Sequence, residues 1–84
     1  MTARFILCAD DFAMTPGISE GILALAEAGR LSATSAMVNM RHWPEVAERA
    51  VALRDRFALG LHLNLTFGAP LGKMPRLAPN GELP

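Results

Sequence analysis

The sequence predicts an α/β fold in which three parallel strands alternate with two helices. Short apolar runs, bounded by polar and turn residues, alternate with two amphipathic segments of helical period, and a long loop follows the last run. Strands that alternate with helices pair in parallel through right-handed crossovers. Such a unit begins either an open doubly wound sheet or a (β/α) barrel, and three strands cannot close a barrel alone.

The composition excludes several classes of protein. The 84 residues are 51% hydrophobic and 19% charged, with 8 Lys and Arg against 8 Asp and Glu. This chain is too apolar for a disordered protein, and it has no basic run for a nucleic-acid partner. No apolar run reaches the roughly 20 residues of a membrane span, and no signal peptide is recognisable. The single cysteine, Cys8, fits a reducing compartment, so we expect a cytoplasmic protein in which this thiol is free and buried.

The first strand is predicted over residues 5–9, an uninterrupted apolar run typical of a strand that is buried on both faces. The first helix is predicted over residues 16–28, with Thr15 as its N-cap, Pro16 at its first position and Gly29 after its end. Its expected buried stripe consists of Ile18, Ile22, Leu25 and Ala26.

The second strand is predicted over residues 31–38, and a second helix over residues 44–55 follows it. This helix has an apolar stripe of Val46, Ala50 and Leu53. Glu45 and Arg49 are four residues apart, which is the spacing of an ion pair on one helical face.

The third strand is predicted over residues 58–66, where apolar and polar residues alternate strictly. One face is all leucine, at positions 59, 61, 63 and 65, and we expect it to pack against helices. The other face carries Gly60, His62 and Asn64. Gly and Pro then recur without a period, which predicts a long loop over residues 67–84.

Acidic, imidazole and amide groups lie where the strands end. Asp10 and Asp11 follow the first strand, Asn39 follows the second, and His62 and Asn64 share a face of the third. Chemistry in such folds gathers at the carboxyl ends of parallel strands, and carboxylate with neutral imidazole suits a divalent metal that activates water. Each group also has a structural interpretation by position alone. The two acids could form a solvated turn, His62 could be a hydrogen-bonded core residue, and Asn39 could be a turn residue.

Alternative classes of function fit these strand ends less well. A phospho-receiver domain needs an acceptor aspartate after its third strand, where this chain has His62 and Asn64. A nucleotide-binding module needs a glycine-rich loop after its first strand, where Asp10-Asp11-Phe12 stands instead. A metal-dependent hydrolase and a non-catalytic α/β module remain. His42 and Trp43 lie in a turn. We expect His42 on the surface or in the N-cap region of the next helix, and Trp43 either packing or lining a sugar site.

Four motifs stand in a specific order and spacing over residues 4–71. They are Ala9-Asp10-Asp11-Phe12, the pairs Gly17-Ile18 and Gly21-Ile22, residues 31–39, and residues 60–70. Together they resemble the YdjC-like carbohydrate deacetylases, a family that includes chitooligosaccharide deacetylases and a hopanoid-biosynthesis branch. The chain departs from the family at Ala13, where glycine is usual.

The resemblance implies that residues 1–84 are the N-terminal portion of one deacetylase domain, an incomplete (β/α) barrel of the polysaccharide-deacetylase type. It implies hydrolysis of an N-acetyl group on an amino sugar or acetylated oligosaccharide, with Mg²⁺ or Zn²⁺ as cofactor. Carried over by position, Asp11 and His62 are metal ligands and Asp10 is the catalytic base. Asn39 and Asn64 are expected to bind the substrate.

The family's third metal ligand, a later histidine, has no counterpart in this chain. The alternative function is therefore a non-catalytic or assembly-dependent truncated module. Three strands also leave open sheet edges and an apolar face, so we expect a homo-oligomer.

Overall fold

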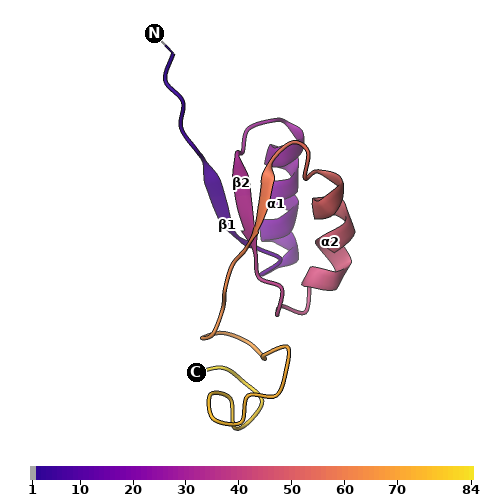
Figure 1. The fold of residues 1–84 in the computed structure, drawn as a ribbon. Helices are drawn as coiled ribbons and strands as arrows, with labels where there is room; N and C mark the ends of the chain where they lie inside the picture. Colours follow the sequence, from indigo (N-terminus) through magenta and orange to yellow (C-terminus); the bar gives the residue numbers. More distant parts are fainter. Residues whose placement is uncertain (1) are drawn as a thin grey trace.

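The computed structural model describes residues 2–84, which form a three-stranded sheet with two helices (Figure 1). The elements in chain order are β1 (Cys8–Phe12), α1 (Pro16–Glu27), β2 (Ala33–Ala36), α2 (Trp43–Ala52) and β3 (Ala58–Leu61). The strands lie in the order β1-β2-β3, and both pairs are parallel. The predicted fold class and element order are confirmed. No helix within residues 2–84 has both the length and the apolar character needed to cross a membrane.

The ends of α1 form as the sequence predicts. The Oγ1 atom of Thr15 accepts a hydrogen bond of 3.2 Å from the backbone N–H of Ile18, which satisfies one of the free donors of the first turn. The helix stops at Glu27, and Gly29 follows in the left-handed region with φ 71°.

The face that α1 buries differs from the predicted stripe. Ile18 and Leu25 are exposed, and the buried positions are Ser19, Ile22, Leu23 and Ala26. The backbone N–H of Ala13 donates a hydrogen bond of 3.0 Å to the buried Oγ of Ser19. This bond turns the Ser19 side of the helix toward the sheet, a constraint that an apolar pattern does not contain.

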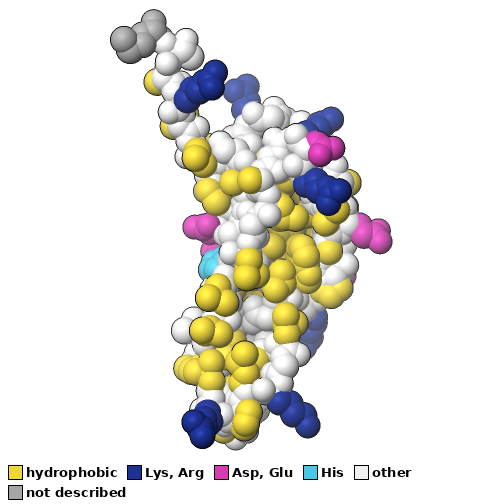
Figure 2. All heavy atoms as spheres, viewed as in Figure 1, with side chains coloured by type: hydrophobic (Ala, Val, Ile, Leu, Met, Phe, Trp, Pro, Cys, Tyr) yellow, Lys and Arg dark blue, Asp and Glu magenta, His cyan; other side chains and the backbone are white. Residues whose placement is uncertain are grey.

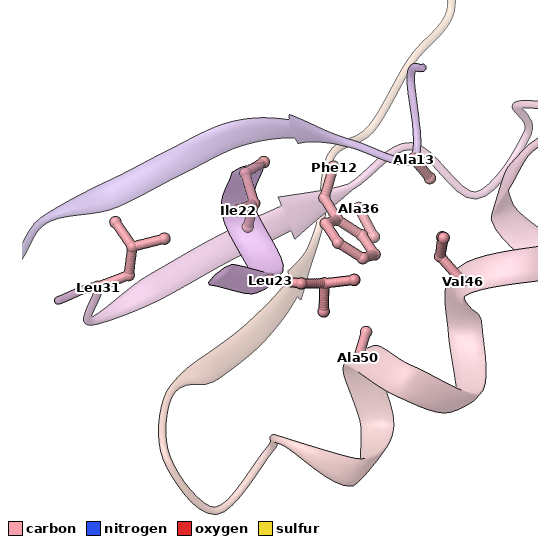
Figure 3. Close-up of a cluster of buried hydrophobic side chains, with 8 residues drawn as sticks. All are labelled: Phe12, Ala13, Ile22, Leu23, Leu31, Ala36, Val46 and Ala50. Atoms are coloured by element: carbon pink, nitrogen blue, oxygen red, sulfur yellow. The ribbon is translucent and has the colours of Figure 1, made fainter. Parts of the chain in front are cut away.

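The core lies between one face of the sheet and the two helices (Figure 3). Val46 and Ala50 of α2 are buried in it and Leu53 packs against it, as predicted. The ring of Trp43 meets that of Phe12 edge to face, with 6.4 Å between centroids. Trp43 therefore has the packing role, one of its two predicted roles. The buried cluster consists of Phe12, Ala13, Ile22, Leu23, Leu31, Ala36, Val46 and Ala50.

The predicted ion pair between Glu45 and Arg49 is wrong. Arg49 instead reaches across to α1, where both of its terminal nitrogens contact the carboxylate of Glu20. Glu45 contacts the Nδ1 atom of His42 at 3.0 Å. The guanidinium of Arg49 binds the carboxylate of Glu20 through two nitrogens, which favours this partner over one on its own helix. The spacing of residues within one helix does not reveal such a partner.

β1 starts three residues later than predicted, and the prediction that this apolar run is buried on both faces is wrong. Phe5 is 80% exposed, and Ile6, Leu7 and Cys8 are exposed as well. β1 is an edge strand, and within residues 2–84 the helices cover only one face of the sheet. The apolar residues 5–7 therefore have no packing partner among the described residues.

β3 ends at Leu61, five residues earlier than predicted. Leu59 packs against the core, but Leu61, Leu63 and Leu65 are exposed, with Leu63 at 71%. The expected packing of the leucine face against helices thus holds at one position only. Figure 2 shows hydrophobic side chains gathered over the middle of the molecule and down the C-terminal loop.

Residues 67–84 contain no helix or strand, as predicted, but they fold back on themselves. The backbone N–H of Leu83 donates to the carbonyl of Gly68 at 2.8 Å, which closes the loop. Gly68 has φ 77°, and a Cβ atom there would lie 2.6 Å from the Cε atom of Met40. The positive φ favours glycine at the neck of the loop, whereas the terminal methyl group of Met40 can move aside for a Cβ atom at little cost.

Candidate functional site

The face of the sheet opposite the helices, called the open face below, carries the polar side chains. Thr34 and Ala36 of β2 point to the helices and are buried. Side chains alternate along a strand, so Ser35 between them points to the open face. Ser35 pairs with Gly60 of β3, which places that residue on the same face.

A β-bulge changes the alternation at the end of β1. Ala9 pairs with Thr34 and Phe12 with Ala36, so three steps along β1 match two steps along β2. The bulge contains Asp11, whose φ is 68°. Because Phe12 takes the place opposite Ala36 on the helix side, the side chain of Asp11 is freed from that side. The sequence predicts that Asp10 and Asp11 follow the first strand; they lie within β1 instead, and the bulge directs Asp11 to the open face.

A tight turn follows the bulge. The backbone N–H of Met14 donates to the carbonyl of Asp11 at 3.1 Å, and Ala13 at the third position of this turn has φ 76°. A type II turn needs this conformation and favours glycine. Ala13 thus occupies a glycine-type conformation, and its N–H is held by Ser19.

Asp11 and His62 meet at the carboxyl ends of β1 and β3. The Oδ1 atom of Asp11 lies 3.2 Å from the Nδ1 atom of His62, and both side chains are partly buried. The Nδ1 atom itself is buried and has no hydrogen-bond partner among the described residues. The backbone N–H of His62 donates to the carbonyl of Ala36 at 2.9 Å, which fixes the end of β3 against β2.

Asp10 is held by a residue that the sequence analysis did not select. Its Oδ1 atom accepts a hydrogen bond of 3.0 Å from the hydroxyl of Ser35, and the thiol of Cys8 lies 3.7 Å from the same oxygen. Desolvation, followed by the negative charge of Asp10 and this S–H contact, raises the pKa of the Cys8 thiol. Only the parallel register of β1 and β2, which places Ser35 beside Asp10, could have indicated this role of Ser35.

Asn39 and Asn64 bind each other and the start of the C-terminal loop. The Asn39 amide donates to the carbonyls of Phe67 at 3.1 Å and Ala69 at 3.0 Å, and the Asn64 amide donates to Asn39 Oδ1 at 3.0 Å and Phe67 O at 2.7 Å. Asn64 Oδ1 accepts from the N–H groups of Thr66 and Phe67. All four amide hydrogens are thus engaged, three with carbonyls of the loop and one between the two asparagines, and the predicted contact with substrate remains a prediction.

No three side chains of His, Cys, Asp or Glu within residues 2–84 lie close enough together to hold a metal ion. His42 is the N-cap residue of α2, as expected near a helix start, and its ring contacts Glu45. The described site therefore consists of the Asp11–His62 pair, with Asp10 and Ser35 on the same face. An acid–imidazole pair at the carboxyl ends of parallel strands defines an α/β protein of the type that places its chemistry at strand ends.

The model of the YdjC-like protein family matches residues 4–84, and the chain belongs to this family. Chitooligosaccharide deacetylases from Enterobacter sp. (strain 638) and Serratia marcescens are 37% and 39% identical to it. These matches cover 99% of this chain but 32% and 33% of the relatives. The chain thus spans about a third of the length of the curated relatives it matches.

A solved structure shares the arrangement of strands and helices. It is the crystal structure of a candidate cellobiose-phosphate cleavage protein from Enterococcus faecalis V583, which is 30% identical to the chain with a TM-score of 0.71. The match covers 88% of this chain and 29% of that one. The three parallel strands and two helices therefore recur as part of a larger α/β fold, as predicted.

Proposed function

We propose that this chain supplies the Asp11, His62 and Asp10 groups of a divalent-metal-dependent carbohydrate deacetylase. The substrate class is an N-acetylated amino sugar or oligosaccharide, and the products are acetate and the free amine. Membership of the YdjC-like family and the similarity to chitooligosaccharide deacetylases support the reaction class. The observation that carries the proposal is the 3.2 Å approach of the Asp11 carboxylate to the His62 imidazole.

This pair fits a divalent metal. Zinc bonds of about 2.0–2.1 Å at tetrahedral angles set neighbouring ligand atoms roughly 3.3 Å apart. Asp11 Oδ1 and His62 Nδ1 are 3.2 Å apart. A buried imidazole nitrogen without a hydrogen-bond partner carries a cost that a metal would remove. Asp11 and His62 would hold the ion, and the further protein ligand that catalytic zinc sites use would come from outside these residues.

The remaining chemistry falls to Asp10. When bound, the metal polarises the acetamide carbonyl and acidifies water. Asp10 Oδ1 is occupied by the Ser35 hydroxyl, so Oδ2 is the atom that accepts the proton from water as water adds to the carbonyl carbon. Cleavage of the C–N bond, with transfer of that proton from Asp10 to the leaving nitrogen, completes the hydrolysis and restores the carboxylate.

Acetate release from N-acetylated chito-oligosaccharides tests this proposal. The protein is expressed from its complete reading frame and assayed with Mg²⁺, with Zn²⁺ and after chelation. Asp11→Asn and His62→Ala should each weaken metal binding by more than about 10–100-fold, which is the typical loss when a residue that only supports a metal ligand is replaced. Activity should fall to a matching extent. Asp55→Asn, in the exposed turn after α2, is the matched control. Unchanged metal affinity in both ligand variants would overturn the assignment.

The alternative, a non-catalytic or assembly-dependent module, is favoured by the two-membered site and the exposed apolar residues Phe5, Leu61 and Leu63. It predicts metal binding without acetate release. It also predicts a homo-oligomer, which light scattering coupled to size exclusion would detect. Acetate release that follows the metal content excludes this alternative.

A further inference from the structure

We infer that Ser35 is a positioning residue whose hydroxyl fixes the carboxylate of Asp10 for proton transfer. The inference rests on the proposed function of Asp10 and adds a residue that the family comparison does not assign. The Ser35 Oγ atom lies 3.0 Å from Asp10 Oδ1, across the parallel pairing of β1 and β2.

The direction of this hydrogen bond follows from the chemistry of the two groups. An ionised carboxylate only accepts, so the hydroxyl of Ser35 must donate its single hydrogen to Oδ1. A hydrogen bond to a charged acceptor is about twice as strong as a neutral one. The bond therefore holds one carboxylate oxygen and leaves Oδ2 with its lone pairs free.

The surroundings of Ser35 leave its hydroxyl to Asp10. Ser35 pairs with Gly60 on its other side, where β3 offers no side chain. A Cβ atom built at Gly60 would meet only the carbonyl of Thr34, at 3.7 Å. No side chain of β3 therefore competes for the hydroxyl at this position, and the open face beside it stays clear.

The location of the bond separates positioning from fold stability. Asp10 is exposed and Ser35 is partly exposed, on the face of the sheet that the helices do not cover. The buried cluster contains neither residue. A single hydrogen bond in this setting contributes on the order of 1 kcal/mol or less to stability, so a large kinetic effect of its removal would reflect the site rather than the fold.

Cys8 provides a reporter that does not depend on deacetylase activity. Its Sγ atom lies 3.7 Å from Oδ1 of Asp10, the same atom that accepts from Ser35. Removal of the Ser35 hydroxyl leaves the thiol as the nearest donor to that oxygen. The S–H bond should then be favoured over the thiolate, and alkylation of Cys8 should slow.

The first test is steady-state kinetics of the protein expressed from its complete reading frame. Ser35→Ala should lower kcat roughly 10-fold or more, part of the 10²–10⁴-fold that a general base contributes, while KM and metal affinity stay within about twofold. Ser35→Thr keeps the hydroxyl and should restore kcat. Ser32→Ala is the matched control, because Ser32 is an exposed serine whose Oγ accepts from the backbone N–H of Leu7. An unchanged kcat in Ser35→Ala overturns the inference.

The second test is the alkylation rate of Cys8 by iodoacetamide, quantified by mass spectrometry of the peptide that contains it. We expect a rate at least about twofold slower in Ser35→Ala than in the parent protein or in Ser32→Ala. An unchanged rate overturns the inference. If alkylation slows in a protein that releases no acetate, the proposed function is refuted. The hydrogen bond from Ser35 to Asp10 is then still supported.

Discussion

Asp11 and Phe12 are neighbours in β1 but belong to different environments. Phe12 is fully buried against the helices, whereas Asp11 lies partly exposed beside His62 in a backbone conformation that L-residues disfavour. The helix side of the sheet gains stability from burial of apolar area. The open face instead holds the Asp11 carboxylate on a bulge with positive φ, a backbone conformation that costs stability. The comparison shows that one strand supplies packing and site geometry on opposite faces.

The largest expected effect comes from emptying part of the core on the helix side of the sheet. Phe12→Ala should lower the free energy of unfolding by about 3–5 kcal/mol, because it empties a fully buried aromatic site beside Trp43. Denaturant unfolding followed by circular dichroism measures this change. Phe5→Ala, at an exposed aromatic position, is the control and should change stability by less than about 0.5 kcal/mol. Equal effects of the two substitutions would contradict the described core.

The next effect concerns the contact that ties the turn after the bulge to α1. Ser19→Ala removes the acceptor of the Ala13 N–H group and leaves that buried donor without a partner. We expect a loss of about 1–3 kcal/mol in the free energy of unfolding. The same denaturant titration tests it, with the exposed Ser32→Ala as comparison. A loss no larger than that of the exposed serine would show that Ala13 finds another acceptor.

A smaller effect isolates the backbone cost of the bulge. At φ 68°, Asp11→Gly should be more stable than Asp11→Ala by about 1 kcal/mol, because glycine adopts this region without a steric penalty. Both variants lack the carboxylate, so both should lose metal affinity by isothermal titration. If the two variants have the same stability, the bulge is not held in the positive-φ region in solution.

The smallest effect concerns the ion pair between the helices. The hydrogen bond from Arg49, opposed in part by desolvation and aided by the Arg49 charge, lowers the pKa of Glu20. The sign follows from linkage: this contribution is present above the pKa of the unfolded state and is lost as pH falls through the folded-state pKa. Glu20→Gln should thus lower Tm slightly at neutral pH and not at acidic pH. Glu48→Gln, an exposed α2 residue, should show no such pH-dependent difference.

Sequence patterns predicted the elements well where local chemistry specifies them. The α1 cap at Thr15, the apolar stripe of α2 and the glycine after α1 depend on neighbours within a few residues, and all three are confirmed. The meeting of Asp11 with His62 followed from parallel topology, which brings strand ends together although they are distant in sequence. The metal and substrate roles of these residues remain predictions.

What the sequence could not reveal depends on contacts between elements. The period-two pattern at Leu61, Leu63 and Leu65 predicts a face suited to burial, but burial also needs a covering element, and the described residues supply none. The bulge at Asp11 is set by the register with β2, and no periodicity marks it. Ser35 appeared as one polar residue in a short strand until that register placed it beside Asp10.

The closed neck of the C-terminal loop has a consequence for how this protein can change. The ends of residues 69–82 are joined where Leu83 N meets Gly68 O at 2.8 Å, and Asn39 and Asn64 hold the side of the neck nearest the strands. A loop whose ends are fixed close together can vary in length or sequence without shifting the strands that precede it. Changes in this segment would therefore reshape the cavity beside the site, because Leu71 and Met74 of the loop line it together with His62.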